Sequence, residues 1–125
     1  MKVKCIKTQL ENNYGAYKAK DTFDDVMDIG DEFFVYGLEF DSKYHNAEVY
    51  TYLYPKMDHL VWIPLELFEI IDDKIPDCWR IQQGYGKRLY FLPDILSQDD
   101  FLENFSEYEP KERAEFEAFR KIYEK

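Results

Sequence analysis

Three pairs of adjacent carboxylates are the first feature of the sequence that could do chemistry, because two close carboxyl groups can divide acid and base roles. They are Asp24-Asp25, Asp72-Asp73 and Asp99-Asp100. Neighbouring residues point to opposite faces of a strand and lie about 100° apart around a helix. We therefore expect these pairs in solvated turns and at helix ends, and not as a catalytic dyad.

Residues that could ligate a metal ion are few. A metal site needs several His, Cys or carboxylate side chains that converge. His45 and His59 belong to no Cys-x-x-Cys or His-x-x-x-His pattern, and we expect both at the surface. Cys5 and Cys78 are expected to be reduced, buried thiols, with a single disulfide between them as the alternative. The sequence thus predicts no metal site and no cofactor.

Nucleophilic and phosphate-binding motifs are also lacking. No serine lies in a Gly-x-Ser-x-Gly elbow. The stretch Gln83–Arg88 contains a G-x-G followed by two basic residues, but a phosphate cradle must open a helix. This loop instead joins two strand-like runs, so we expect a binding protein and not an enzyme.

An aromatic strand is the better candidate for a binding site. Tyr50, Tyr52 and Tyr54 share one face of a predicted strand, and tyrosine is enriched in recognition surfaces. The opposite face carries Val49, Thr51 and Leu53. The predicted partner-binding residues of this region are Tyr36, Glu39, Asp41, Tyr44, Glu48, Tyr50, Tyr52 and Tyr54. Two interpretations stay open: the rings are exposed for recognition, or they pack beneath the C-terminal hairpin and helix.

The charge of the chain indicates the kind of partner. Its 125 residues include 16 basic and 26 acidic ones, for a net charge of −10 that is spread over both halves. Proteins that bind a phosphate backbone need clustered Lys and Arg, so we expect no nucleic-acid partner. An acidic surface attracts a basic protein, because complementary potentials speed the encounter.

The sequence also predicts where the protein resides. Its longest apolar stretch, Leu60–Leu65, is far too short to span a membrane. Met1–Lys7 alternates charged and apolar residues and lacks the apolar core of a signal peptide. We therefore expect a cytoplasmic protein with no membrane partner.

Residues 1–75 are predicted to be mostly β. Period-two patterning with aromatic and β-branched residues is typical of strands. It occurs at Met1–Lys7, Asp31–Phe40, Ala47–Tyr54, His59–Ile63 and Phe68–Ile71. Pro64 cannot donate a ladder hydrogen bond, so we expect a strand to end there and a 3₁₀ turn to follow over Pro64–Leu67.

The second half of the sequence has a different pattern. Cys78–Gln82 and Arg88–Leu92 flank a glycine-bearing loop and predict a β-hairpin. Ser97 is the expected N-cap of one helix, and Pro110 the first residue of another. The last helix carries an apolar stripe of Phe116, Phe119 and Tyr123. We expect this stripe to dock on the preceding strands, with a partner-binding helix as the alternative.

Two stretches resemble a known fold family. Trp62–Ile71, with its strand, proline-initiated turn and closing strand, resembles the end of Src-homology-3-like barrels. Gly30–Tyr36 resembles the "G-x-x-Y-x-V" second strand of such barrels. The resemblance implies a small antiparallel barrel over residues 1–72. The overall expectation is an α+β fold in which a β-hairpin and C-terminal helices, residues 73–125, dock on that barrel.

The second half resembles a functional family. Ile75–Ile81, Leu92–Leu96 and Phe101–Phe105 look like segments of bacterial immunity proteins from polymorphic toxin systems. That resemblance implies a non-catalytic inhibitor of a basic toxin. The alternative is an adaptor or regulatory domain that binds a peptide or protein through the aromatic face of the barrel.

Overall fold

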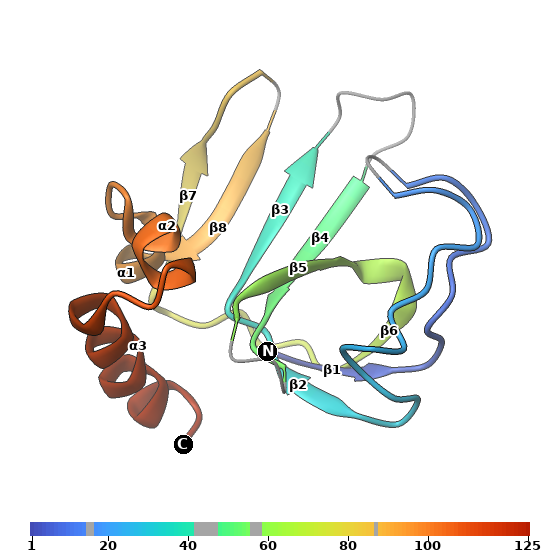
Figure 1. Cartoon of the computed structure of the whole chain (residues 1–125), viewed down its shortest axis with the longest axis horizontal. Helices are drawn as coiled ribbons and strands as arrows, with labels where there is room; N and C mark the ends of the chain where they lie inside the picture. The colour runs from blue at the N-terminus through green and yellow to red at the C-terminus, as the bar shows by residue number, and fades with distance from the viewer. Residues whose placement is uncertain (15–16, 42–47, 56–58, 87) are drawn as a thin grey trace.

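The computed structural model describes residues 1–14, 17–41, 48–55, 59–86 and 88–125, and these form an α+β fold. Two antiparallel sheets are followed by C-terminal helices (Figure 1). The smaller sheet has the order β2-β1-β6, with β2 at Glu32–Phe34, β1 at Lys2–Cys5 and β6 at Phe68–Asp72. The larger sheet has the order β5-β4-β3-β8-β7. Its strands are β5 (Val61–Pro64), β4 (Glu48–Leu53), β3 (Gly37–Asp41), β8 (Leu89–Pro93) and β7 (Trp79–Gln83).

The strand expected over Asp31–Phe40 is wrong, because the chain changes sheets in its middle. β2 pairs with β1, whereas β3 pairs with β4 and β8. Between β2 and β3, the Val35 amide donates to the Met1 carbonyl at 3.0 Å and the Tyr36 amide to the Tyr52 carbonyl at 2.8 Å. Val35 and Tyr36 are both buried, so this corner links the two sheets through the interior.

The end of the first half follows the sequence pattern. β5 ends at Pro64, the 3₁₀ helix η1 covers Leu65–Leu67, and β6 begins at Phe68. β6 then closes onto β1. This arrangement is consistent with a Src-homology-3-like barrel, although the two sheets do not close into a single continuous one.

The predicted hairpin is confirmed as β7 and β8. β8 also pairs with β3, so the hairpin extends the larger sheet. The division of the chain into two parts at residue 72 stays a prediction. Cys5 and Cys78 are free thiols, as expected. Cys5 is buried but Cys78 is exposed, because it lies in the exposed link that leads into β7.

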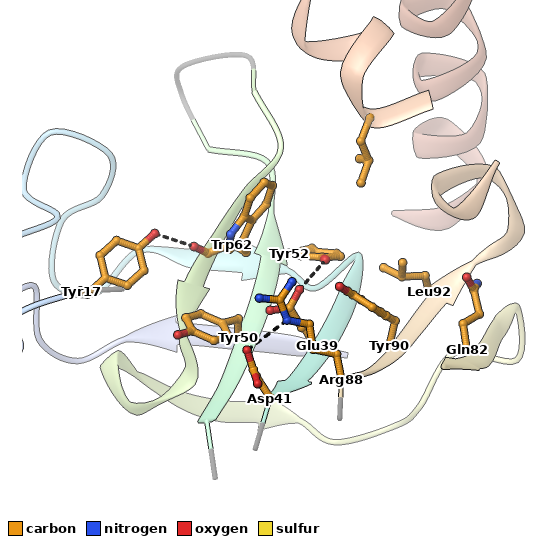
Figure 2. Close-up of a pocket in the computed structure, with 11 residues that line it drawn as sticks. Tyr17, Glu39, Asp41, Tyr50, Tyr52, Trp62, Gln82, Arg88, Tyr90 and Leu92 are labelled. Carbon is orange, nitrogen blue, oxygen red and sulfur yellow. Dashed lines mark hydrogen bonds and ion pairs between the residues drawn. The ribbon is translucent and has the colours of Figure 1, made fainter. Parts of the chain in front are cut away.

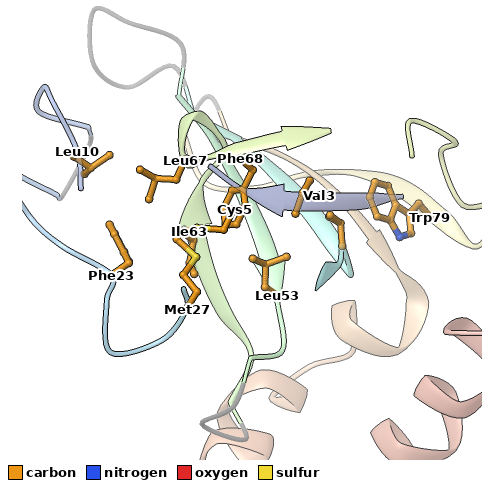
Figure 3. Packing of buried hydrophobic residues seen from close by; sticks show 11 residues of the cluster. Val3, Cys5, Leu10, Phe23, Met27, Leu53, Ile63, Leu67, Phe68 and Trp79 are labelled. Atoms are coloured by element: carbon orange, nitrogen blue, oxygen red, sulfur yellow. The ribbon is translucent and has the colours of Figure 1, made fainter. Parts of the chain in front are cut away.

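The first hydrophobic core lies between the two sheets (Figure 3). Alternation along β1 buries Val3 and Cys5, as the sequence pattern predicts. Leu53 of β4 and Ile63 of β5 face them from the larger sheet (Figure 3). The cluster is completed by Leu10, Phe23, Met27, Val35, Leu67, Phe68 and Trp79.

The three helices are α1 (Asp94–Ser97), α2 (Phe101–Ser106) and α3 (Pro110–Tyr123). Pro110 begins α3, as expected. Ser97 is not the N-cap of α2: it ends α1, and its hydroxyl donates to the Asp94 carbonyl at 2.9 Å. Asp100, with a φ of 62°, precedes α2 instead. Among the described residues no helix is long and apolar enough to cross a membrane.

The apolar stripe of α3 is docked, which confirms the first of its two interpretations. Phe116 is fully buried, and its ring centroid lies 4.9 Å from that of Phe105, 5.0 Å from Tyr54 and 5.4 Å from Tyr36. This second core joins the helices to β4 and β8. Its buried members are Tyr36, Tyr52, Leu92, Leu96, Phe101, Phe105 and Phe116.

Replacing Phe116 with alanine tests the second core. We expect Phe116→Ala to lower the free energy of unfolding by about 3–5 kcal/mol, because it leaves a cavity among packed rings. Ile122→Ala, on the same helix but at a position that is 76% exposed, should change it by less than about 0.5 kcal/mol. Urea denaturation measures both. Equal losses in the two variants would show that α3 does not complete the core.

Candidate functional site

The tyrosines predicted for partner binding are buried. Tyr36, Tyr50 and Tyr52 are 1%, 6% and 5% exposed, so the expectation of an exposed tyrosine face is wrong at these positions. Tyr52 belongs to the second core and Tyr54 packs on Phe105 and Phe116 of the helices, as the packed alternative predicts. Tyr50 instead packs against the N-terminal loop, where the Tyr14 ring centroid lies 5.3 Å away.

The carboxylates of this region lie deeper than expected. Glu48 is 4% and Asp41 6% exposed, and Glu39 is half-buried. The Tyr50 hydroxyl donates to Glu48 Oε2 at 2.8 Å, which satisfies a buried carboxylate with a buried hydroxyl. Tyr44 lies outside the described residues.

Four of the predicted residues nevertheless come together in one cleft of about 500 Å³ (Figure 2). They are Glu39, Asp41, Tyr50 and Tyr52. The rest of the lining is Tyr17, Trp62, Gln82, Arg88, Tyr90, Leu92 and Leu102. Tyr36, Glu48 and Tyr54 are not part of it.

Strand register explains why these side chains meet. Tyr90 of β8 lies opposite Glu39 of β3, which in turn lies opposite Tyr50 of β4. Gln82 of β7 is opposite Tyr90, so one row crosses four strands. Directly opposed residues project from the same face of a sheet, and this face is the floor of the cleft.

Gly37 lets two side chains that line the cleft, those of Leu92 and Tyr52, pack closely over β3. A Cβ atom at this position would lie 2.3 Å from Leu92 Cδ2 and 3.0 Å from Tyr52 Cδ2. Both distances are shorter than a carbon–carbon contact, so the missing side chain makes room for these two residues. Glycine at position 37 therefore lets β8 and β4 bring their side chains together across β3.

The cleft holds a polar network. Arg88 Nε lies 3.1 Å from Asp41 Oδ2, and the Tyr52 hydroxyl donates to Glu39 Oε1 at 3.3 Å. The Tyr90 hydroxyl links the two pairs, since it interacts with both Glu39 and Arg88. Two carboxylates, one guanidinium and two hydroxyls thus share one side of the cleft.

Burial has an effect on the ionisation of Glu39. It raises the pKa of this carboxyl group above its ordinary value, because a partly desolvated charge is unfavourable. The Tyr52 hydroxyl and the Arg88 guanidinium oppose the shift, and the neighbouring Asp41 charge adds to it. Burial also raises the pKa of Tyr52 and of Tyr90, so both hydroxyls stay protonated as donors at neutral pH.

Several residues that line the cleft were not among the site residues predicted from the sequence. The sequence pattern indicates Arg88 only as the start of a hairpin strand and as part of the basic pair after the G-x-G, and Tyr90 only as part of the same strand. Arg88 immediately precedes β8 and Tyr90 lies within it, and alternation places both side chains on one face. Only the pairing of β8 with β3 brings that face to Glu39 and Asp41.

The lining of the cleft consists mainly of aromatic and charged side chains. No Ser, Cys or His is among the described residues that line the cleft. The described part of the chain also holds no group of three or more His, Cys, Asp or Glu side chains placed to bind a metal ion. What the cleft offers is aromatic faces, carboxylates and hydroxyl donors.

Comparison with known proteins identifies no similar protein. Neither a protein-family model, nor a curated protein, nor a solved structure matches the chain.

The raised pKa of Glu39 predicts a pH-dependent effect on stability. An acid whose pKa is higher in the folded state stabilises the fold at low pH and loses that contribution as pH rises through the folded pKa. Glu39→Gln does not titrate. Its melting temperature relative to the native protein should therefore increase between about pH 4 and about pH 7.

A thermal-shift series across this pH range measures the effect. Glu69→Gln serves as the control, because Glu69 is exposed on β6 and its variant should show no such trend. A difference between Glu39→Gln and the native protein that does not change with pH would contradict the prediction.

Proposed function

We propose that the protein is a non-catalytic binding module for a basic protein, and that it acts as an immunity-type inhibitor of a basic toxin. The observation that carries this proposal is the position of the cleft between two acidic segments. These segments are residues 21–32 and 94–109, and neither contains Lys, Arg or His.

The carboxylates of both acidic segments lie mostly at the surface. The first carries Asp21, Asp24, Asp25, Asp28, Asp31 and Glu32, of which Asp31 alone is half-buried. The second carries Asp94, Asp99, Asp100, Glu103, Glu107 and Glu109, all exposed. Carboxylates at this density, with no Lys, Arg or His in either segment, produce a negative potential that extends into solvent.

The two segments border the cleft on different sides. Leu102 of α2, within the second segment, lines the cleft itself. A neighbouring groove shares Tyr17 and Trp62 with the cleft and is also lined by Asp25 of the first segment. A basic surface that approaches the cleft therefore meets carboxylates from both sides, which supports fast, charge-steered association.

One observation favours a second function, that of an adaptor for peptides. Trp62 is 47% exposed at the cleft, and its ring meets that of Tyr52 edge-on at 5.7 Å. Tyr17 lines the same side. Proline-rich peptides bind in aromatic grooves of this kind.

Charge reversal beside the cleft tests the proposed inhibitor. The partner to use is the basic toxin expected from the adjacent gene. Asp99→Lys combined with Glu103→Lys should weaken its binding at least about tenfold, chiefly through slower association. Asp73→Lys combined with Asp77→Lys makes the same change in net charge in the exposed link before β7, and should weaken binding much less.

Calorimetry at low and high salt, and growth rescue on co-expression, are the measurements for this prediction. Native binding should weaken steeply as salt rises. An adjacent gene product that is not toxic, or equal losses in the two double variants, would argue against the inhibitor.

A proline-rich peptide array tests the adaptor. Trp62→Ala should lose binding to the peptides that the native protein binds, whereas Ile81→Ala should retain it. Ile81 is a suitable control because it is 68% exposed and lies on β7 outside the cleft. An array without hits, or hits that Trp62→Ala keeps, would reject this function.

A further inference from the structure

The cleft already contains one guanidinium group, that of Arg88. Its Nε atom lies 3.1 Å from Asp41 Oδ2, and the side chains are 40% and 7% exposed, respectively. The carboxylate is thus fixed in the sheet, on β3, while the cation reaches it on a flexible stem from the solvent side. Arg88 shows which chemical group this part of the cleft accepts.

A second carboxylate nearby is incompletely compensated. Glu39 accepts a hydrogen bond from the Tyr52 hydroxyl at 3.3 Å, a long contact for a charged acceptor. Its partial burial makes the ionised form unfavourable. Arg88 and Asp41 are the charged groups that act on it, and Tyr52 and Tyr90 are its hydroxyl neighbours. A cation that approaches Glu39 more closely than Arg88 does would stabilise the ionised carboxylate.

Aromatic rings complete the cleft, and cations bind favourably over such rings. Tyr52 and Trp62 meet at one wall, and Tyr17 lies 6.4 Å from Tyr50, centroid to centroid, at another. The chain uses the same interaction elsewhere, because the Arg113 guanidinium lies 3.8 Å from the centroid of the Phe105 ring.

We propose that the cleft binds the guanidinium group of an arginine side chain, which takes the place beside Asp41 and Glu39 that Arg88 occupies in the free protein. This proposal rests on the proposed function in one respect: the basic partner supplies the arginine. A planar guanidinium can form bidentate hydrogen bonds to carboxylates while its face stacks on a ring, whereas an ammonium group has no planar face to stack. The volume of about 500 Å³ is ample for one such side chain.

Nuclear magnetic resonance with a capped arginine, N-acetyl-arginine N-methylamide, tests the proposal without the partner. The protein has two tryptophans, and only Trp62 lines the cleft. The indole N–H signal of Trp62 should shift and saturate as the arginine compound is added. The signal of Trp79, which is 7% exposed in the first core, should stay in place.

Capped citrulline, which has the same shape without the charge, should cause no shift. Equal shifts with citrulline and arginine would overturn the proposal, and so would shifts with capped lysine at equal or lower concentration.

Variants of Glu39 and of Arg88 test whether the arginine compound binds at this position of the cleft. Glu39→Gln should weaken the binding of the arginine compound about tenfold, the usual effect of losing one hydrogen bond to a charged group. The variant keeps the shape of the side chain, so the loss would not reflect unfolding. Glu69→Gln, at an exposed position on β6, should bind as the native protein does.

Arg88→Gln should bind the compound several-fold more tightly, because it removes the internal competitor. Unchanged affinity in Glu39→Gln, or weaker binding in Arg88→Gln, would overturn the proposal.

Binding of the basic protein partner to the native protein and to Glu39→Gln distinguishes the guanidinium proposal from the proposed function. If a basic toxin binds the native protein and Glu39→Gln equally well, the cleft proposal is wrong and the function stands. If the arginine compound binds the cleft but no basic protein does, the cleft is a guanidinium site and the proposed function is wrong.

Discussion

The pairing of β3 with β8 is the interaction on which the rest of the molecule depends. It consists of three opposed residue pairs, Leu38–Phe91, Glu39–Tyr90 and Phe40–Leu89. The pairing attaches the hairpin to the larger sheet, and β8 leads directly into α1. Both the second core and the polar network of the cleft exist because of this attachment, since neither half of the chain contains all their residues.

β4 is buried on both faces, and the same attachment helps to cover one of them. Thr51 and Leu53 face the first core, while Tyr52 on the other face meets the helices. Buried hydroxyls need partners, and carboxylates of the neighbouring positions provide them. The acidic residues next to this strand are therefore part of the interior, and much of the exposed acidic charge lies on residues 21–32 and 94–109.

Local features of the fold were predictable from the sequence, because they depend on local chemistry. Pro64 ends β5 and starts the 3₁₀ turn since it lacks an amide hydrogen, and Pro110 begins α3 for the same reason. The break at Val35 was not predictable, because alternation continues through it and only tertiary contacts bend the chain there. Serine is a favoured residue type at N-caps, but the residues that precede Ser97 already form a helical turn, so Ser97 ends a helix and does not begin one.

The candidate site was predictable only in part. The alternation of Tyr50 and Tyr52 correctly placed them on one face, and Glu39 and Asp41 near them. A pattern of period two does not show what covers a face, so the sequence left both exposure and burial of these rings open. Arg88 lies 47 positions after Asp41, and no local signal in the sequence links the segment of Arg88 and Tyr90 to β3.

The corner between the sheets also has a consequence for the order of folding. The Tyr123 hydroxyl donates to the Val35 carbonyl at 2.5 Å, and the Tyr36 hydroxyl donates to Glu124, each across 88 positions of sequence. Contacts between such distant residues form slowly, because a long loop must close before they contribute any energy. During synthesis, the first six strands can pair before α3 is available to cover Val35 and Tyr36. Until α3 emerges and docks, the ring of Tyr36 is open to solvent, and in that interval the chain offers an apolar surface for chaperones or for aggregation.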